Sequence, residues 1–155
     1  MIGKKGIKMR TDFYNNIGIG VIAISSIFNH CEELSVSKSF LIIPFITHFE
    51  LTIFLANKRT NTKSIEELIS QKTSCFSNVN KRYYDSLSLT INAIQYLIDM
   101  GYIELRDGNL KRIKILNYHK NMGGRADKIY KASENIARIL RGTENRLYLS
   151  LRVIV

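Results

Sequence analysis

The chain has 155 residues, of which 45% are hydrophobic and 23% are charged, so it is long enough to bury a core of its own. This length and composition exclude a chain that needs disulfides or a metal to fold, and they predict one domain spanning residues 1–155. The two cysteines, Cys31 and Cys75, form no CxxC motif, which argues against a disulfide framework or a zinc ribbon. A reducing cytoplasm is therefore the expected location.

The net charge of +10 is distributed unevenly along the chain. Residues 1–10 carry four positive charges and no negative ones, residues 11–105 carry seven and nine, and residues 106–155 carry twelve and four. A basic arm and a basic C-terminal third favour an anionic partner, either a nucleic acid or an acidic protein surface. The alternative is a solvated basic face that only confers solubility.

No segment has the pattern of a membrane span or a signal peptide. The longest apolar stretch, 40–55, is interrupted by Pro44, His48 and Glu50, and is too short and polar to cross a bilayer. No apolar core directly follows the basic residues of 1–10, so no secretory peptide is expected either. We expect no membrane partner.

After a basic arm at 1–12, residues 13–57 are predicted to form apolar helices. Residues 15–28 are almost continuously apolar, with Gly18, Gly20 and Ala23 small enough to let another backbone approach. Residues 35–55 form a second apolar block, where Pro44 predicts a kink or a new helix nearby, and thus two short helical pieces.

Residues 64–116 have the order of a winged-helix unit. Ser64 and Glu67 form the pattern of a capping box at the start of a short helix, and a second helix follows around Val79. A third helix passes through Leu97 and is expected to end at Gly101. The Asp-Gly pair at 107–108 then predicts a β-hairpin, the wing.

Residues 124–155 are predicted to form an amphipathic helix with a basic polar face, followed by a tail. Gly142 is expected to stop that helix. Residues 146–155 alternate apolar and polar side chains, and periodicity alone leaves a short helix and a terminal strand equally open. The fold class is therefore mainly α with a minor α+β component.

The sequence contains no pattern typical of a catalytic, metal or nucleotide site. His30 and Cys31 lack further ligands at metal-binding spacing, and the acidic residues are scattered. The glycine pairs lack the lysine and hydroxyl residue of a phosphate-binding loop. We expect no enzyme activity, no metal and no cofactor in this chain.

Basic residues near the predicted wing are the candidate contacts to nucleic acid or to an acidic partner. The third helix offers Asn92, Gln95 and Asp99 but no Arg or Lys to read guanine, so phosphate contact or protein docking is favoured over sequence reading. The candidate contact residues are Lys81, Arg82, Arg106, Lys111, Arg112 and Lys114.

Apolar residues at both ends are the candidate docking residues. The first helix carries apolar groups on more than one side, and the C-terminal alternation suits a strand added to a partner's sheet. These residues are Ile17, Val21 and Ile24 at one end and Leu147, Leu149, Leu151 and Val153 at the other.

Several segments in a fixed order resemble the middle component of bacterial three-component ABC-ATPase systems, the group that includes Lamassu-type antiphage defence. They are Tyr14-Asn15-Asn16, the segment 40–44 with His48, Lys58-Arg59-Thr60, the segment 93–101 with its hairpin, and 147–153. One departure is Leu151-Arg152-Val153, where a Leu-Gly-Val-like turn is expected.

The resemblance implies a kleisin-like or winged-helix adaptor on the head or neck of an SMC/Rad50-like ATPase. Such an adaptor would help control an effector, commonly a nuclease, in response to foreign DNA, and double-stranded DNA would be bound directly or through the complex. Two other classes stay open at this point: a free-standing winged-helix transcription regulator and an RNA-associated basic protein.

Overall fold

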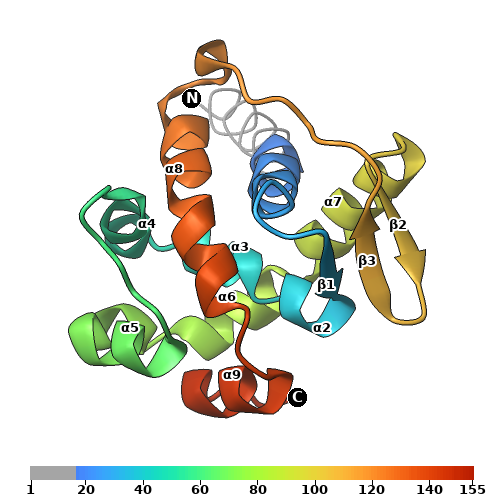
Figure 1. Cartoon of the computed structure of the whole chain (residues 1–155). Coiled ribbons are helices and arrows are strands. Elements are labelled where there is room, and N and C mark those ends of the chain that lie inside the picture. The colour runs from blue at the N-terminus through green and yellow to red at the C-terminus, as the bar shows by residue number, and fades with distance from the viewer. Residues whose placement is uncertain (1–16) are drawn as a thin grey trace, which may run out of the picture.

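The computed structural model describes residues 17–155, so the expected basic arm at 1–12 lies outside the described residues. The described part is mainly helical with one small antiparallel sheet, as predicted (Figure 1). Its elements are an N-terminal helix Ile17–Ile27, β1 Glu33–Ser35, α2 Val36–Ser39, α3 Ile42–Ile46, α4 Phe49–Ala56, α5 Ile65–Gln71, η1 Thr73–Phe76, α6 Val79–Asp85, α7 Leu87–Asp99, β2 Ile103–Arg106, β3 Asn109–Arg112, η2 Lys120–Met122, α8 Gly124–Ile139 and α9 Glu144–Leu151.

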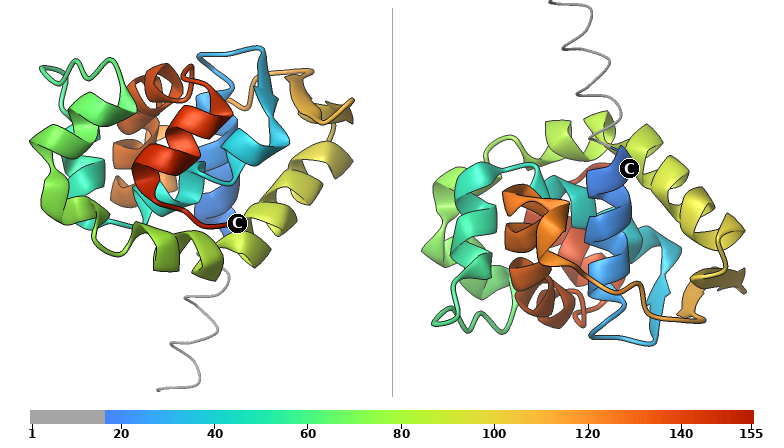
Figure 2. Two further views of the ribbon diagram at one scale, coloured as in Figure 1. Left: turned by 90° about the horizontal axis from the view of Figure 1, so that it is seen from below. Right: turned by 90° about the horizontal axis from the view of Figure 1, so that it is seen from above.

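The N-terminal helix lies between α8 and α7 (Figure 1 and Figure 2). A Cβ added at Gly20 would stand 3.3 Å from Leu89 Cδ1 and 3.4 Å from the Cβ of Ala93, so the small residue lets this helix approach α7 closely. The side chains of Val21 and Ile24 are buried in the core that this packing creates. Ile24 is therefore unavailable to a partner, in contrast to its expected docking role.

The apolar block at 35–55 forms three short helices rather than the two pieces predicted. Pro44 occupies the first turn of α3, where its missing N–H costs no helical hydrogen bond. The chain turns by 103° between the segments Val36–Ile46 and Phe49–Ala56. Thr52 holds this bend, because its hydroxyl donates to the carbonyls of Ile46 at 3.1 Å and His48 at 2.9 Å.

Within residues 17–155, no single helix is long and apolar enough to cross a bilayer. The bent pair Val36–Ile46 and Phe49–Ala56 reaches that length and composition only together, and much of it lies in the core.

Local signals at 64–116 are confirmed in detail. Ser64 Oγ accepts from the Glu67 amide at 3.2 Å, while the Glu67 carboxylate caps the amide of Lys63 rather than that of Ser64. Gly101 has φ +77 and follows α7 in a Schellman motif, with the Tyr102 amide donating to the Leu97 carbonyl.

The hairpin turns at Asp107 and Gly108, both with positive φ, as a two-residue type I′ turn requires. Strand β1, which the sequence patterns did not predict, pairs with β3 and gives the order β1-β3-β2. Leu34 lies opposite Leu110 in this ladder, and both side chains are buried.

The helices of 64–116 pack both on one another and on other parts of the chain. α5 contacts α9, and α6 contacts α3. In the described residues, the buried hydrophobic side chains other than Ala126 belong to one cluster that runs from the N-terminal helix to Val153. The helices of 64–116 are followed by a β-hairpin in the expected order, but they share their core with the rest of the chain.

The C-terminal segment is a helix, so the alternative of a terminal strand was wrong. Thr143 caps α9, and its hydroxyl accepts from the Arg146 amide at 3.3 Å. Leu147 and Leu151 lie one turn apart on the inner side of α9 and are almost completely buried. Their apolar spacing serves this helix and offers no strand to a partner's sheet.

Candidate partner-contacting surfaces

Arg82 was predicted to contact an anionic partner, and the structure gives it an internal role instead. Its Nε donates to the carbonyl of Pro44 at 3.1 Å, and its Nη2 donates to the carbonyl of Cys75 at 2.9 Å. Burial lowers the pKa of this guanidinium from its ordinary value. Arg82 therefore joins α6 to α3 and η1 through its Nε and Nη2 atoms.

Arg112 is a second correction. Its Nη1 donates to the carbonyl of Phe28 at 2.7 Å, its Nη2 lies 3.8 Å from Glu32, and its side chain is 24% exposed. Arg112 and the buried Leu110 occupy alternate positions of β3, so both side chains face the same side of the sheet. The arginine holds the sheet to the end of the N-terminal helix.

The remaining predicted contact residues are at the surface but do not form an unopposed basic patch. Lys81 pairs with Asp85 at 2.6 Å, and Arg106 lies 3.5 Å from Glu104. Lys111 stands between two glutamates in the sheet, with Glu33 opposite it on β1 and Glu104 on β2. The fourth, Lys114, lies over the ring of Tyr102 at 4.5 Å.

The outer face of α7 carries no positive charge at all. Asn92, Gln95 and Asp99 are exposed there, and Gln95 donates to Asp99 at 2.8 Å. Two hydrophobic side chains of α7, Ile91 and Tyr96, are also exposed, as is Met100 directly after the helix. A helix of this composition is poorly suited to a phosphate backbone.

The predicted docking residues divide into buried and exposed ones. Val21, Ile24, Leu147, Leu151 and Val153 are at most 8% exposed and pack inside the chain, so the surface does not present them to a partner. Ile17 is partly exposed.

Leu149, by contrast, is 78% exposed and remains a docking candidate. It borders an apolar groove of about 630 Å³ formed by α2, α6, α9 and the C-terminal tail. Tyr83 and Tyr148 meet edge to face at the groove with ring centroids 5.8 Å apart, and the hydroxyl of Tyr148 donates to the Ser37 carbonyl at 2.5 Å. Burial raises the pKa of Tyr148, so its hydroxyl keeps its proton. We call this the C-terminal groove, lined by Val36, Ser37, Phe40, Tyr83, Glu144, Asn145, Tyr148, Leu149, Val153 and Val155.

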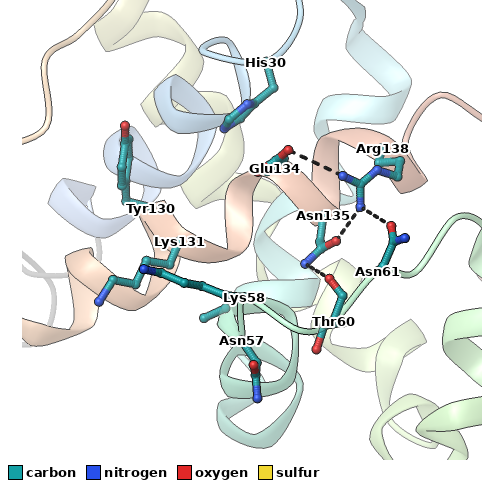
Figure 3. Close-up of a pocket in the computed structure, with 11 residues that line it drawn as sticks. His30, Asn57, Lys58, Thr60, Asn61, Tyr130, Lys131, Glu134, Asn135 and Arg138 are labelled. Carbon is teal, nitrogen blue, oxygen red and sulfur yellow. Dashed lines mark hydrogen bonds and ion pairs between the residues drawn. The ribbon is translucent and has the colours of Figure 1, made fainter.

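A second concave surface lies between α8 and the loop that follows α4, and we call it the α4–α8 cleft (Figure 3). It has a volume of about 550 Å³ and a polar lining. Ala56 is its one aliphatic lining residue; the others are His30, Asn57, Lys58, Thr60, Asn61, Tyr130, Lys131, Glu134, Asn135 and Arg138.

A hydrogen-bond network on α8 holds the loop of this cleft in place. The buried Asn135 donates from Nδ2 to the carbonyls of Leu55 at 2.8 Å and Thr60 at 3.2 Å. Arg138 Nη1 donates to Asn135 Oδ1 at 2.7 Å and to Asn61 Oδ1 at 3.2 Å. The wall of the cleft is therefore fixed before any partner binds.

His30 closes one side of the cleft as a neutral group. The Ser133 hydroxyl donates to the carbonyl of Tyr130 at 2.6 Å, so His30 Nε2, 3.1 Å from Ser133 Oγ, acts as the donor in that pair. Burial lowers the pKa of His30 from 6.5, although Glu134 opposes this effect.

Sequence reasoning noted a basic polar face on α8 but did not assign a site to it. Arg125, Lys128, Lys131 and Arg138 follow one another at helical spacing of three to seven residues. This spacing was a usable signal. The contribution of Lys58 could not be predicted from helical spacing, because Lys58 lies in a different segment that is brought next to α8 only by the fold.

Among residues 17–155, no three His, Cys, Asp or Glu side chains gather as a metal site would require. The described surface instead has an apolar groove and a basic cleft, and such features are typical of a protein that contacts partners.

The chain matches the family model of the ABC-three component (ABC-3C) system Middle Component 3 over residues 22–154, and it belongs to that family. No curated protein and no solved structure matches it.

Proposed function

We propose that this protein is a non-catalytic adaptor that docks on the SMC/Rad50-like ATPase of its system and helps control a nuclease or other effector in response to foreign DNA. Its membership in a three-component family supports partnership with other components. A Lamassu-type antiphage role in the cytoplasm is part of this proposal.

The observation that carries the proposal is the C-terminal groove. Leu149, Ile154 and Val155 are 75–90% exposed beside it, although the same chain buries Leu147 and Leu151 almost completely. Exposed apolar side chains around an aromatic-lined depression are typical of protein interfaces. Among residues 17–155, Glu144 is the only charged side chain that lines the groove, in a chain with a net charge of +10. A nucleic acid would not be attracted to such a surface.

The rival class, a free-standing winged-helix transcription regulator, is less well supported. Its recognition helix would be α7, which contains no Arg or Lys and exposes Ile91 and Tyr96. Recognition of guanine in the major groove commonly uses Arg or Lys.

The test is retrieval of the ATPase component from co-expressing cells by the tagged protein. Leu149→Glu should abolish retrieval, because it places a carboxylate at the centre of the apolar contact. Ile91→Glu is the matched control, since Ile91 is also an exposed apolar residue on a helix, at 55%. Both variants should melt like the unmodified protein.

Full retrieval by Leu149→Glu together with loss by Ile91→Glu would move the docking surface to α7 and overturn the groove proposal. Sequence-specific DNA binding by the isolated chain, with no ATPase retrieved by any variant, would favour the regulator instead.

A further inference from the structure

The basic charge on α8 is arranged as a row rather than as a point. Three cations of this helix, Lys128, Lys131 and Arg138, lie toward one side of it, whereas Arg125 lines a different cavity beside α3 and α6. With a rise of about 1.5 Å per residue, the three extend over roughly 15 Å. A single small anion needs cations that converge on one point, whereas a row of this length matches a polyanion.

Lys58 adds to this row from outside the helix. In Figure 3 its side chain extends from the loop after α4 toward α8, where Lys131 lies. Among residues 17–155, no carboxylate lies within 4.0 Å of the Lys58 ammonium group. Its charge is therefore available to a ligand in the α4–α8 cleft.

The carboxylates near the cleft are already occupied by basic partners. Asp127 lies 2.8 Å from Lys131, and Glu134 lies 3.5 Å from Arg138. Hydrogen bonds from Lys131 and Tyr118 lower the pKa of Asp127, so it remains ionised and neutralises part of the row. Even so, α8 contains four cations and two carboxylates, while α7 contains one carboxylate and no cation.

The lining of the cleft also indicates the kind of partner. Protein interfaces depend on buried apolar and aromatic anchors, but the cleft offers Ala56 as its one aliphatic residue. The ring of Tyr130 is already stacked on Tyr118, with centroids 4.4 Å apart and an angle of 9° between the planes. Lysines and amide side chains on a rigid concave wall are instead suited to phosphate and sugar oxygens.

We propose that the α4–α8 cleft and the cationic row of α8 bind the sugar-phosphate backbone of DNA, independently of base sequence. This surface is separate from the predicted wing, whose Arg112 is engaged internally and whose Lys111 stands between glutamates. Helix α8 lies across the N-terminal helix from α7 (Figure 1 and Figure 2). The DNA contact itself does not depend on the proposed function. Only the statement that this DNA is bound within an ATPase complex rests on it.

The test measures binding of the full chain to a short fluorescent DNA duplex by anisotropy over a range of salt concentrations. The double variant Lys58→Gln/Lys131→Gln should weaken binding roughly tenfold and make the salt dependence of log Kd shallower by about 1 for each lysine. The matched control, Arg106→Gln/Lys111→Gln, removes the same charge from the wing and should change the affinity less than about twofold. All variants keep residues 1–16 unchanged, so any contribution from the cations there is common to them.

Equal weakening by both double variants would mean that only net charge matters, and unaltered binding by the cleft variant would mean that DNA lies elsewhere; either result overturns the proposal. A competition experiment with poly-glutamate tests whether an acidic protein could occupy the same surface. If it displaced the duplex at equal charge concentration and lost affinity in the cleft variant, the partner would be an acidic protein and not DNA. Leu149→Glu should leave the DNA affinity unchanged, so failure of ATPase docking and failure of DNA binding can be told apart.

Discussion

Asn135 and Arg138 stand one turn apart on α8, and the guanidinium of Arg138 donates to the amide oxygen of Asn135 at 2.7 Å. The same amide donates through its nitrogen to the carbonyls of Leu55 and Thr60. The side chain of Asn135 thus uses both its acceptor and its donors, which joins the end of α4 to α8 and orients the wall of the cleft.

Asn135→Ala should lower the free energy of unfolding by about 1–3 kcal/mol, because two carbonyls lose their buried donor. Urea denaturation provides the measurement. Asn61→Ala is the control, since it removes only one exposed acceptor of Arg138, 3.2 Å away, and should cost less. Equal losses in the two variants would contradict the central role of Asn135.

Arg112→Gln should destabilise the protein by about 1–3 kcal/mol, since a charged donor to the Phe28 carbonyl is lost in a partly buried position. Lys111→Gln, one residue away, should be nearly neutral because Lys111 makes no ion pair within 4.0 Å in the described residues. Comparison of the two denaturation curves tests the internal role of Arg112. If Arg112→Gln melted like Lys111→Gln, Arg112 would be free to act as a surface contact after all.

The pKa of His30 predicts how stability depends on pH. Burial lowers this pKa from 6.5, with Arg138 and Arg141 adding to the effect and Glu134 opposing it. The unfolded chain therefore binds more protons than the folded one just below pH 6.5, so the stability contributed by His30 is complete above 6.5 and is lost as the pH falls toward the folded value.

The measurement is the free energy of unfolding at one pH above 6.5 and at another between 4.5 and 6.5. The lowered pKa values of Glu66, Asp127 and Glu144 act below that window, so they should not mask the effect. His30→Gln keeps a donor near Ser133 but does not titrate, and its stability should change less between the two conditions. An identical pH dependence in both proteins would rule out His30 as its source.

Elements set by local chemistry could be predicted from the sequence. The Asp107-Gly108 turn, the Gly101 cap and the amphipathic α8 each follow from neighbouring residues, and each is present. Strand β1 could not be predicted, since its three residues have no strong pattern and become a strand only by pairing with β3.

Side-chain roles that depend on distant segments were also out of reach. Arg112 looks like a wing cation in sequence, but the carbonyl it binds belongs to Phe28, 84 residues earlier. The α4–α8 cleft combines Lys58 with α8 in the same way. Arg152 follows α9 with φ 56, a left-handed conformation that favours glycine. This is the position at which the family resemblance led us to expect a glycine.

The C-terminal segment provides the sharpest comparison between helix and strand. In a strand, Leu147, Leu149 and Leu151 would share one face, and truncating any of them would have a similar effect. In α9, Leu147 and Leu151 point into the core at 0% and 2% exposure, while Leu149 points outward at 78%.

Leu147→Ala should therefore cost about 2–5 kcal/mol through the cavity it leaves. Leu149→Ala, with the same chemical change two residues away, should alter stability by less than about 0.5 kcal/mol. For the same reason, removal of residues 146–155 should destabilise the whole chain instead of leaving residues 64–116 folded, because α5 packs on α9 and Arg146 pairs with Glu66. Thermal and urea denaturation of the three variants measures these differences. Equal destabilisation by Leu147→Ala and Leu149→Ala would indicate a strand, and a truncated chain that melts like the full one would show that α9 contributes nothing to the core.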